Sequence, residues 1–117
     1  MIVDAHPDGD GDFLVAIEAS VDGFCGHADG HVVGLDFQTF ARQCHALEEK
    51  RQGAAILGSA LEGEFTLSIH STDGVGHMGV SGHLRYSRGD QFAQRLDFEF
   101  SFDPAELQNV LRAINNI

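Results

Sequence analysis

Every second side chain from residue 13 to residue 21 is apolar, namely Phe13, Val15, Ile17, Ala19 and Val21. The opposite face carries Leu14, Ala16, Glu18 and Ser20, and Asp22-Gly23 follows at once. A repeat of two is the repeat of a β-strand, whose successive side chains point to opposite faces of a sheet. Asp-Gly favours the two-residue type I′ turn of a hairpin, because both central residues of that turn take a positive φ. The sequence therefore predicts a β-hairpin around this turn. Its expected facing pairs are Val21 with Phe24, Ile17 with Ala28, and Phe13 with Val32.

The same alternation returns later in the chain and predicts four further strands. These are expected at 55–61, 64–70, 77–86 and 92–102. Asp73-Gly74 is a second hairpin signal, and a two-residue loop at this point places His70 opposite His77. The same register sets Ile69 opposite Met78 and Leu67 opposite Val80. Because the steps between neighbouring strands are short, we expect the strands within each block to be antiparallel.

Two segments carry apolar residues at helical spacing behind a residue that can cap a helix. The first follows Asp36, a candidate N-cap, and its apolar stripe is Phe37, Phe40, Ala41, Cys44 and Leu47. The second follows Asp103, which suits the N-cap position, while Pro104 suits the first helical position. Its apolar stripe is Leu107, Val110, Leu111, Ile114 and Ile117.

The predicted order of elements is ββα-ββββ-α, which belongs to the α+β class. Each strand has one apolar and one polar face, and each helix has a single apolar stripe. The simplest arrangement is a single twisted antiparallel sheet of five to six strands with both helices packed on one face. Residues 1–11, rich in Asp and Gly, are expected to form a flexible acidic lead-in, and residues 12–117 a single domain.

The net charge of the chain limits the kinds of partner that it is expected to bind. Seven Lys and Arg residues against eighteen Asp and Glu give a formal net charge of −11. Nucleic acids and anionic membranes are bound through cationic side chains, so neither is expected as a partner. The chain has no apolar run of the ~18 residues that a membrane span needs, and its first twelve residues do not resemble a signal peptide. We expect a cytoplasmic protein in which Cys25 and Cys44 are free thiols.

The polar face of the predicted sheet is the candidate binding surface. In the simplest interpretation this face is exposed to solvent and binds nothing. In the more specific interpretation its carboxylates attract a basic protein partner. The residues predicted to contact such a partner are Glu18, Asp29, Glu64, His70, His77, His83, Asp97 and Glu99.

Seven histidines also suggest a metal-binding module. A zinc site needs three or four converging ligands, whereas same-face neighbours along one strand, such as His27 and Asp29, stand ~6.6 Å apart. The sequence contains no H-E-x-x-H, paired-cysteine, G-x-S-x-G or Walker motif. We therefore predict no metal site, no cofactor and no catalytic residues.

Four stretches carry a resemblance to a known family. They are L35-D-F-x-x-F40, G53-A-A-I-L-G through S68-I-H70, D73-G-V-G-H-M-G-V-S-G-H-L84, and L96-D-F-E-F-S-F-D103-P-A-E-L107. Over residues 13–117 the chain resembles the WapI-type immunity proteins of bacterial polymorphic-toxin systems. The resemblance implies a non-enzymatic inhibitor that binds a cognate protein toxin, expected to be basic, inside the producing cell.

Two other functions remain as alternatives at this stage. One is a small-molecule-binding or accessory α+β domain that acts as a homodimer through its sheet face. The other is a metal-binding module built on the histidines. The sequence is compatible with a monomer or a homodimer.

Overall fold

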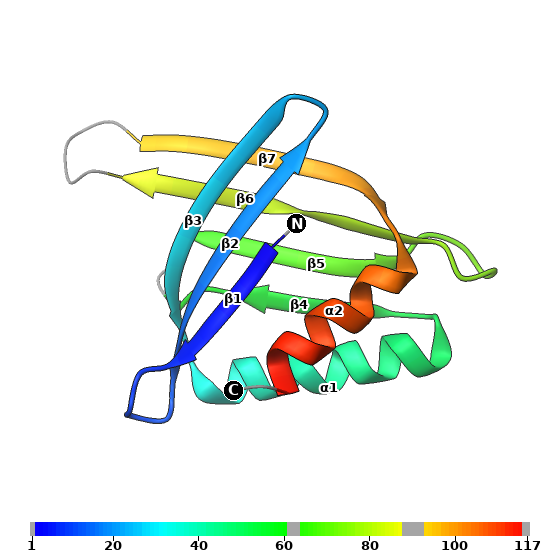
Figure 1. The fold of residues 1–117 in the computed structure, drawn as a ribbon, viewed down its shortest axis with the longest axis horizontal. Coiled ribbons are helices and arrows are strands. Elements are labelled where there is room, and N and C mark those ends of the chain that lie inside the picture. Colours follow the sequence, from blue (N-terminus) through cyan, green and yellow to red (C-terminus); the bar gives the residue numbers. More distant parts are fainter. Residues whose placement is uncertain (1, 61–63, 88–92, 116–117) are drawn as a thin grey trace.

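A computed structural model of the protein describes residues 2–60, 64–87 and 93–115 (Figure 1). Within these ranges, three strands precede the first helix and four more strands precede the second. In chain order the elements are β1 (Ile2–Pro7), β2 (Phe13–Val21), β3 (Phe24–Val32), α1 (Gly34–Lys50), β4 (Ala54–Gly58), β5 (Phe65–Ser71), β6 (Met78–Ser87), β7 (Ala93–Phe102) and α2 (Pro104–Asn115). The α+β class is confirmed. No helix in the described ranges has both the length and the apolar character of a membrane span.

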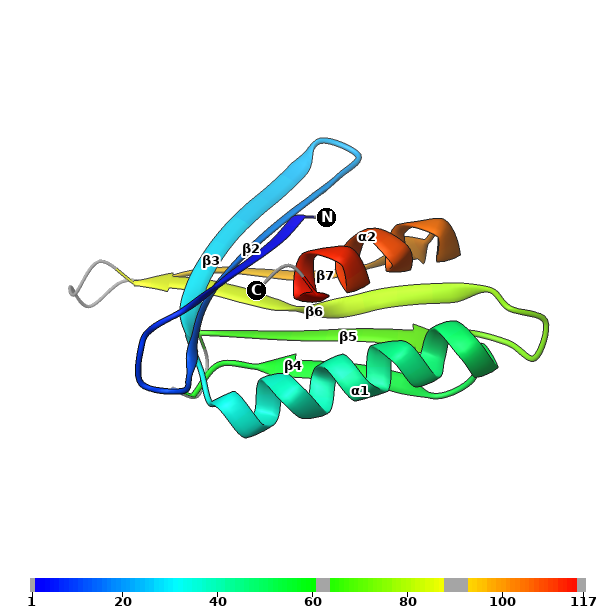
Figure 2. The ribbon, with the colours of Figure 1, turned by 60° about the horizontal axis from the view of Figure 1, so that its bottom comes forward.

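The strands form two antiparallel sheets, so the prediction of a single sheet is wrong. One sheet has the order β1-β2-β3 and the other the order β4-β5-β6-β7. Figure 2 shows the three-stranded sheet crossing one face of the four-stranded sheet, with α2 beside it. Both sheets have an apolar face, and each can bury that face against the other. Alternation in a sequence identifies such a face but does not identify what covers it.

The first residues also differ from the predicted lead-in over 1–11. Strand β1 pairs with β2 and sets Val3 opposite Ile17 and Ala5 opposite Val15. Val3 and Ala5 pack against the core, whereas the Asp- and Gly-rich residues 8–12 connect the two strands. The alternation within β1 is short, and because turn residues follow it directly, the sequence does not identify this strand.

The two predicted hairpin registers have different outcomes. The β2–β3 register is confirmed at all three expected pairs, Val21–Phe24, Ile17–Ala28 and Phe13–Val32. The β5–β6 register is wrong by two residues, since His70 lies opposite Gly79 rather than His77. In place of the expected pairs, Ile69 lies opposite Val80 and Leu67 opposite Gly82.

A longer loop explains the second register. The backbone N–H of Thr72 donates to the carbonyl of His77 at 3.0 Å, so four residues, 73–76, form the connection instead of two. Gly76 takes a φ of 99°, a conformation that favours glycine. Because the register moved by two residues, every side chain kept the face that alternation predicted.

The helix starts are only partly as predicted. Asp103 caps α2, because its carboxylate accepts a hydrogen bond from Ala105 N at 3.0 Å, and Pro104 is the first helical residue. Helix α1 begins two residues before the predicted cap, at Gly34, whose N–H donates to the Asp12 carboxylate at 2.8 Å. A residue 22 positions away therefore caps this helix, which local sequence patterns cannot reveal.

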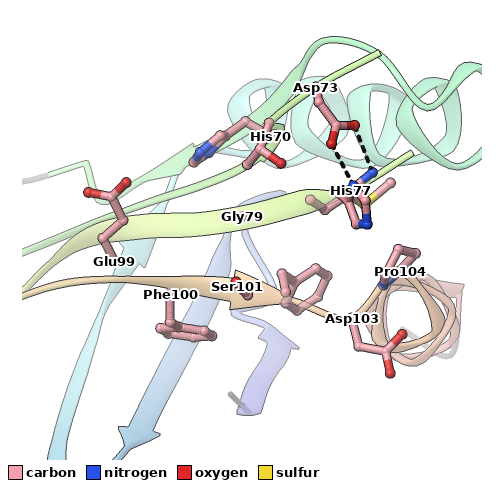
Figure 3. A pocket seen from close by; sticks show the side chains of 12 residues that line it. His70, Asp73, His77, Gly79, Glu99, Phe100, Ser101, Asp103 and Pro104 are labelled. Carbon is pink, nitrogen blue, oxygen red and sulfur yellow. Dashed lines mark hydrogen bonds and ion pairs between the residues drawn. The ribbon is translucent and has the colours of Figure 1, made fainter. Parts of the chain in front are cut away.

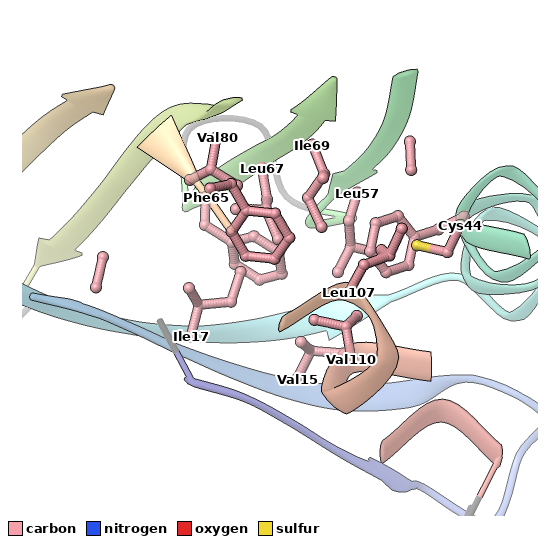
Figure 4. Packing of buried hydrophobic residues seen from close by; sticks show 14 of the residues in the cluster. Val15, Ile17, Cys44, Leu57, Phe65, Leu67, Ile69, Val80, Leu107 and Val110 are labelled. Carbon is pink, nitrogen blue, oxygen red and sulfur yellow. The ribbon is translucent and has the colours of Figure 1, made fainter. Parts of the chain in front are cut away.

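The core lies between the two sheets and the helices (Figure 4). Ile17 of the three-stranded sheet lies opposite Phe65 and Val80 of the four-stranded sheet, and Val15 lies beside Val110 of α2. Helix α2 contributes Leu107 and Val110, and α1 contributes Phe37, Phe40, Cys44 and Leu47. Burial raises the pKa of the Cys44 thiol to about 12, so this cysteine is an inert part of the core, whereas Cys25 is exposed.

Candidate functional site

Polar side chains cover the outer face of the four-stranded sheet, which is the face turned away from the core. Four of the predicted contact residues share it, namely His70 on β5, His83 on β6, and Asp97 and Glu99 on β7. Cross-strand pairing sets His83 opposite Asp97 and Ser81 opposite Glu99. Residues that face each other across a ladder point to the same side of a sheet. The predicted grouping of these four residues on one face is therefore present in the structure.

One end of this face is hollowed into an open polar groove of about 860 Å³. Figure 3 shows His70, Asp73 and His77 along one side of strand β6 and Ser101 and Asp103 along the other. Gly79 lies opposite His70 and leaves the middle of the groove open, since a Cβ there would stand 3.1 Å from the His70 imidazole. The groove brings together His70, His77 and Glu99 from the predicted set.

The β5–β6 loop holds His77 in place through Asp73. The Asp73 carboxylate accepts hydrogen bonds from Val75 N at 2.9 Å and His77 N at 3.2 Å, and its second oxygen contacts His77 Nδ1 at 2.5 Å. The bond from the Val75 N–H, followed by that from the His77 side chain, lowers the pKa of Asp73 below its ordinary value. The carboxylate thus stays ionised and anchors one wall of the groove.

The other predicted contact residues lie elsewhere. Glu18 and Asp29 are exposed on the outer face of the three-stranded sheet, on the opposite side of the core. Glu64 is only half-exposed, and its Oε2 atom is buried against Gly30, where a Cβ would meet it. The prediction of one continuous polar face assumed a single sheet. Because the strands form two sheets, the predicted contact residues lie on two separate faces.

Strand β7 borders a second depression that sequence analysis did not predict. We call it the aromatic hollow; Ala19, Phe24, Leu96, Phe98 and Phe100 supply its apolar lining, over about 400 Å³. Phe24, at the tip of the β2–β3 hairpin, is 72% exposed, which is unusual for an aromatic side chain. Alternation assigned Phe24 to the apolar face correctly, but exposure depends on the hairpin tip extending beyond the sheet beneath it.

Carboxylates surround the aromatic hollow. Asp22, Asp97 and Glu99 line it, and a neighbouring depression adds Asp103 and Glu106. Within the described ranges, Asp97 is the only one of the five with an ion pair, which it forms with Arg95 at 2.9 Å. The surface along β7 therefore has an apolar centre and an acidic rim, an arrangement common in protein–protein interfaces.

The Thr66 hydroxyl and the His83 imidazole are arranged like a catalytic nucleophile and its general base. Thr66 Oγ1 lies 2.9 Å from His83 Nδ1 on the outer face of the four-stranded sheet. A catalytic pair also needs a group that orients the base and a site that excludes water. The Asp97 carboxylate opposite His83 bonds to Arg95 instead, and Thr66 is exposed. This pair is accounted for as a cross-strand contact.

Asp8, Asp12 and His31 form a cluster of side chains whose oxygen and nitrogen atoms could serve as metal ligands. One ligand atom from each residue lies within 4.8 Å of the others, and His31 Nε2 contacts Asp8 at 2.8 Å and Asp12 at 3.4 Å. The cluster also has a structural role, because Asp12 caps α1 and both aspartates fasten the β1–β2 loop to the end of β3. The sequence did not predict this grouping, since the three residues meet only through the hairpin pairing.

Asp8 should make the protein sensitive to acid. The N–H of Asp10 donates a hydrogen bond to the Asp8 carboxylate at 2.7 Å and lowers the pKa of Asp8 below the ordinary 3.8. Asp12 N and His31 lower this pKa further by smaller amounts. A lowered pKa in the folded state gives stability that is present above the ordinary value and lost as pH falls through the folded-state value. We expect Asp8→Asn to be less stable than the unmodified protein at pH 7, with the difference closing below pH 4.

Urea unfolding midpoints measured from pH 7 to pH 2.5 test this expectation. Asp10→Asn is the matched control, because it removes a charge from the same loop, and the Asp10 carboxylate accepts no hydrogen bond among the described residues. If the gap between Asp8→Asn and the unmodified protein were the same at every pH, Asp8 ionisation would not contribute to stability.

Comparison with known proteins supplies a family. The family model described as the immunity protein WapI-like family matches residues 3–117, essentially the whole chain. No curated protein and no solved structure matched the chain.

Proposed function

The chain belongs to the WapI-like immunity protein family, and we propose on this basis that it neutralises a cognate toxin domain by binding it directly. The observation that carries the proposal is the family match over 3–117, which includes every strand of the core except the first residue of β1. Inhibition by occupancy needs no chemistry from the inhibitor, so the protein is proposed to act without catalysis or a cofactor. The proposed place of action is the cytoplasm of the producing cell.

The surface along β7 is the proposed site of contact. It combines the polar groove with the aromatic hollow, and Glu99 and Phe100 line both. Five of the predicted residues lie on it or on the adjoining sheet face: His70, His77, His83, Asp97 and Glu99. Glu18, Asp29 and Glu64 lie outside it, so we assign them no part in the central contact.

Charge supports a basic partner. The net charge of −11 attracts a basic domain over several ångströms and raises the rate of productive encounter. Toxins that cut nucleic acids bind phosphates, and carboxylates along β7 such as Glu99, which has no ion pair among the described residues, would occupy the same cationic side chains. The proposed partner is therefore a basic toxin domain.

Co-expression tests the proposal. We expect growth of cells that produce the toxin domain encoded beside this gene to be restored when the protein is produced with it. The two chains should also co-purify as a stable complex. A neighbouring toxin that still kills, and that does not bind the purified protein, would overturn the proposed function.

A further inference from the structure

We infer that an extended segment of the toxin adds to the free edge of β7 as a further strand and inserts an apolar side chain, flanked by Lys or Arg, into the aromatic hollow. This inference rests on the proposed function and specifies the chemistry of the partner segment. It draws on three features: an open strand edge, an apolar socket beside it and an acidic rim.

The first feature is the edge itself. Strand β7 ends the order β4-β5-β6-β7, and among the described residues it pairs only with β6, along its full Ala93–Phe102 length. An edge strand presents a row of backbone donors and acceptors that another strand can complete. The opposite edge is different, because α1 lies beside β4 and the Gln43 side chain accepts the hydrogen bond from Ile56 N at 3.0 Å.

The second feature is the aromatic hollow. Phe24 overhangs β7 from the hairpin tip, while Phe98 and Phe100, whose ring centroids are 5.9 Å apart, form the floor. Gly26 permits this approach, since a Cβ there would stand 2.6 Å from Leu96 Cδ2. A buried apolar anchor surrounded by weaker contacts is the usual energetic centre of a protein interface. The exposed Phe24 ring is the side chain that such an anchor would cover.

The third feature selects the occupant. Asp22 and Glu99 on the rim have no ion-pair partner in the described ranges, and Asp97 has only Arg95. A second copy of this chain would bring its own acidic rim against these carboxylates, which is unfavourable at a net charge of −11. A segment with Lys or Arg beside its apolar anchor would instead pair with them. The occupant is therefore a basic toxin segment.

The test measures binding of the catalytically inactivated toxin domain encoded beside the gene. Phe24→Ala removes the exposed wall of the hollow, and Glu99→Lys reverses the rim charge that borders both depressions. We expect each to weaken affinity at least about tenfold, the loss typical of a residue at the centre of an interface. The matched controls are Ile56→Ala, an exposed apolar residue on the opposite edge, and Glu18→Lys, on the other sheet; each should change affinity less than about threefold.

Hydrogen exchange of the complex tests strand addition separately from the side-chain contacts. We expect alternate backbone amides of β7 to become protected when the toxin domain binds, while amides of β1 do not change. Unchanged urea midpoints for the variants show that they are folded.

The outcomes separate the two proposals. If the unmodified protein does not bind the toxin domain, the proposed function fails and this inference fails with it. If the unmodified protein binds but Phe24→Ala and Glu99→Lys bind equally well, or β7 gains no protection, the inference alone is overturned. Light scattering that shows a dimer dissociated by Phe24→Ala would assign the hollow to a second copy and would also overturn it.

Discussion

Truncation of Phe65 to alanine is expected to lower the free energy of unfolding by about 3–5 kcal/mol, the cost of deleting a large aromatic side chain from a packed core. Phe65 is 1% exposed and starts β5 between the two sheets (Figure 4). Its ring lies against β3, where a Cβ on Gly30 would stand 3.0 Å from Cε1. The cavity would therefore open at the contact between the sheets, where neighbouring strands cannot move to fill it without breaking their pairing.

Phe24→Ala is the matched control, because it deletes the same atoms from a side chain that is 72% exposed. We expect it to change the free energy of unfolding by less than about 0.5 kcal/mol. Urea unfolding followed by circular dichroism measures both variants against the unmodified protein. Equal losses at the two positions would mean that Phe65 does not join the sheets. Paired with the binding assay, the same two variants should separate stability from recognition.

Local features of the fold were predictable from sequence, whereas long-range ones were not. The β2–β3 register followed from Asp22-Gly23, and the start of α2 followed from Asp103 and Pro104, because in each case adjacent residues supply the turn or the cap. The β5–β6 register depended on whether the turn has two residues or four, and the Asp73 side chain decides this by bonding to backbone groups two and four positions ahead.

The division into two sheets needed information that alternation does not contain. An apolar strand face is buried equally well by helices or by another sheet. Helix α1 separates β3 from β4 in the chain, so no short turn forces the two blocks of strands to pair. Strand β1 was missed for a related reason: six residues ahead of an Asp- and Gly-rich loop carry too little pattern to identify a strand.

The sequence predicted those parts of the candidate site that depend only on which face of a strand each side chain occupies. Period two grouped His70, His83, Asp97 and Glu99 correctly, and the register error in β5–β6 left this grouping intact because it was an even number of residues. Period two also placed Phe24, Phe98 and Phe100 on the apolar side. It could not show that the hairpin tip extends past the core and leaves an aromatic hollow at the surface.

Association with the proposed toxin partner is expected to slow at least about tenfold as ionic strength rises from about 20 to 500 mM, because salt screens the attraction that guides encounter. The dissociation rate should change much less, since contacts within a formed interface are short and poorly screened. Stopped-flow or surface-binding kinetics separate the two rates. Glu99→Gln is expected to reduce the association rate and its salt dependence together, whereas Gln108→Ala, an uncharged change on α2, should affect neither.

Acidification should weaken the same attraction. Histidine is the side chain whose charge ordinarily changes between pH 5 and 8, and protonation of all seven would raise the net charge from −11 to −4. His70, His77 and His83 stand on or beside the proposed contact surface, next to the carboxylates of β7. We expect the association rate at low salt to fall from pH 7.5 to pH 5, and the fall to disappear at high salt, where screening has already removed the attraction. A rate indifferent to both salt and pH would assign the acidic residues to solubility and leave the aromatic hollow as the source of affinity.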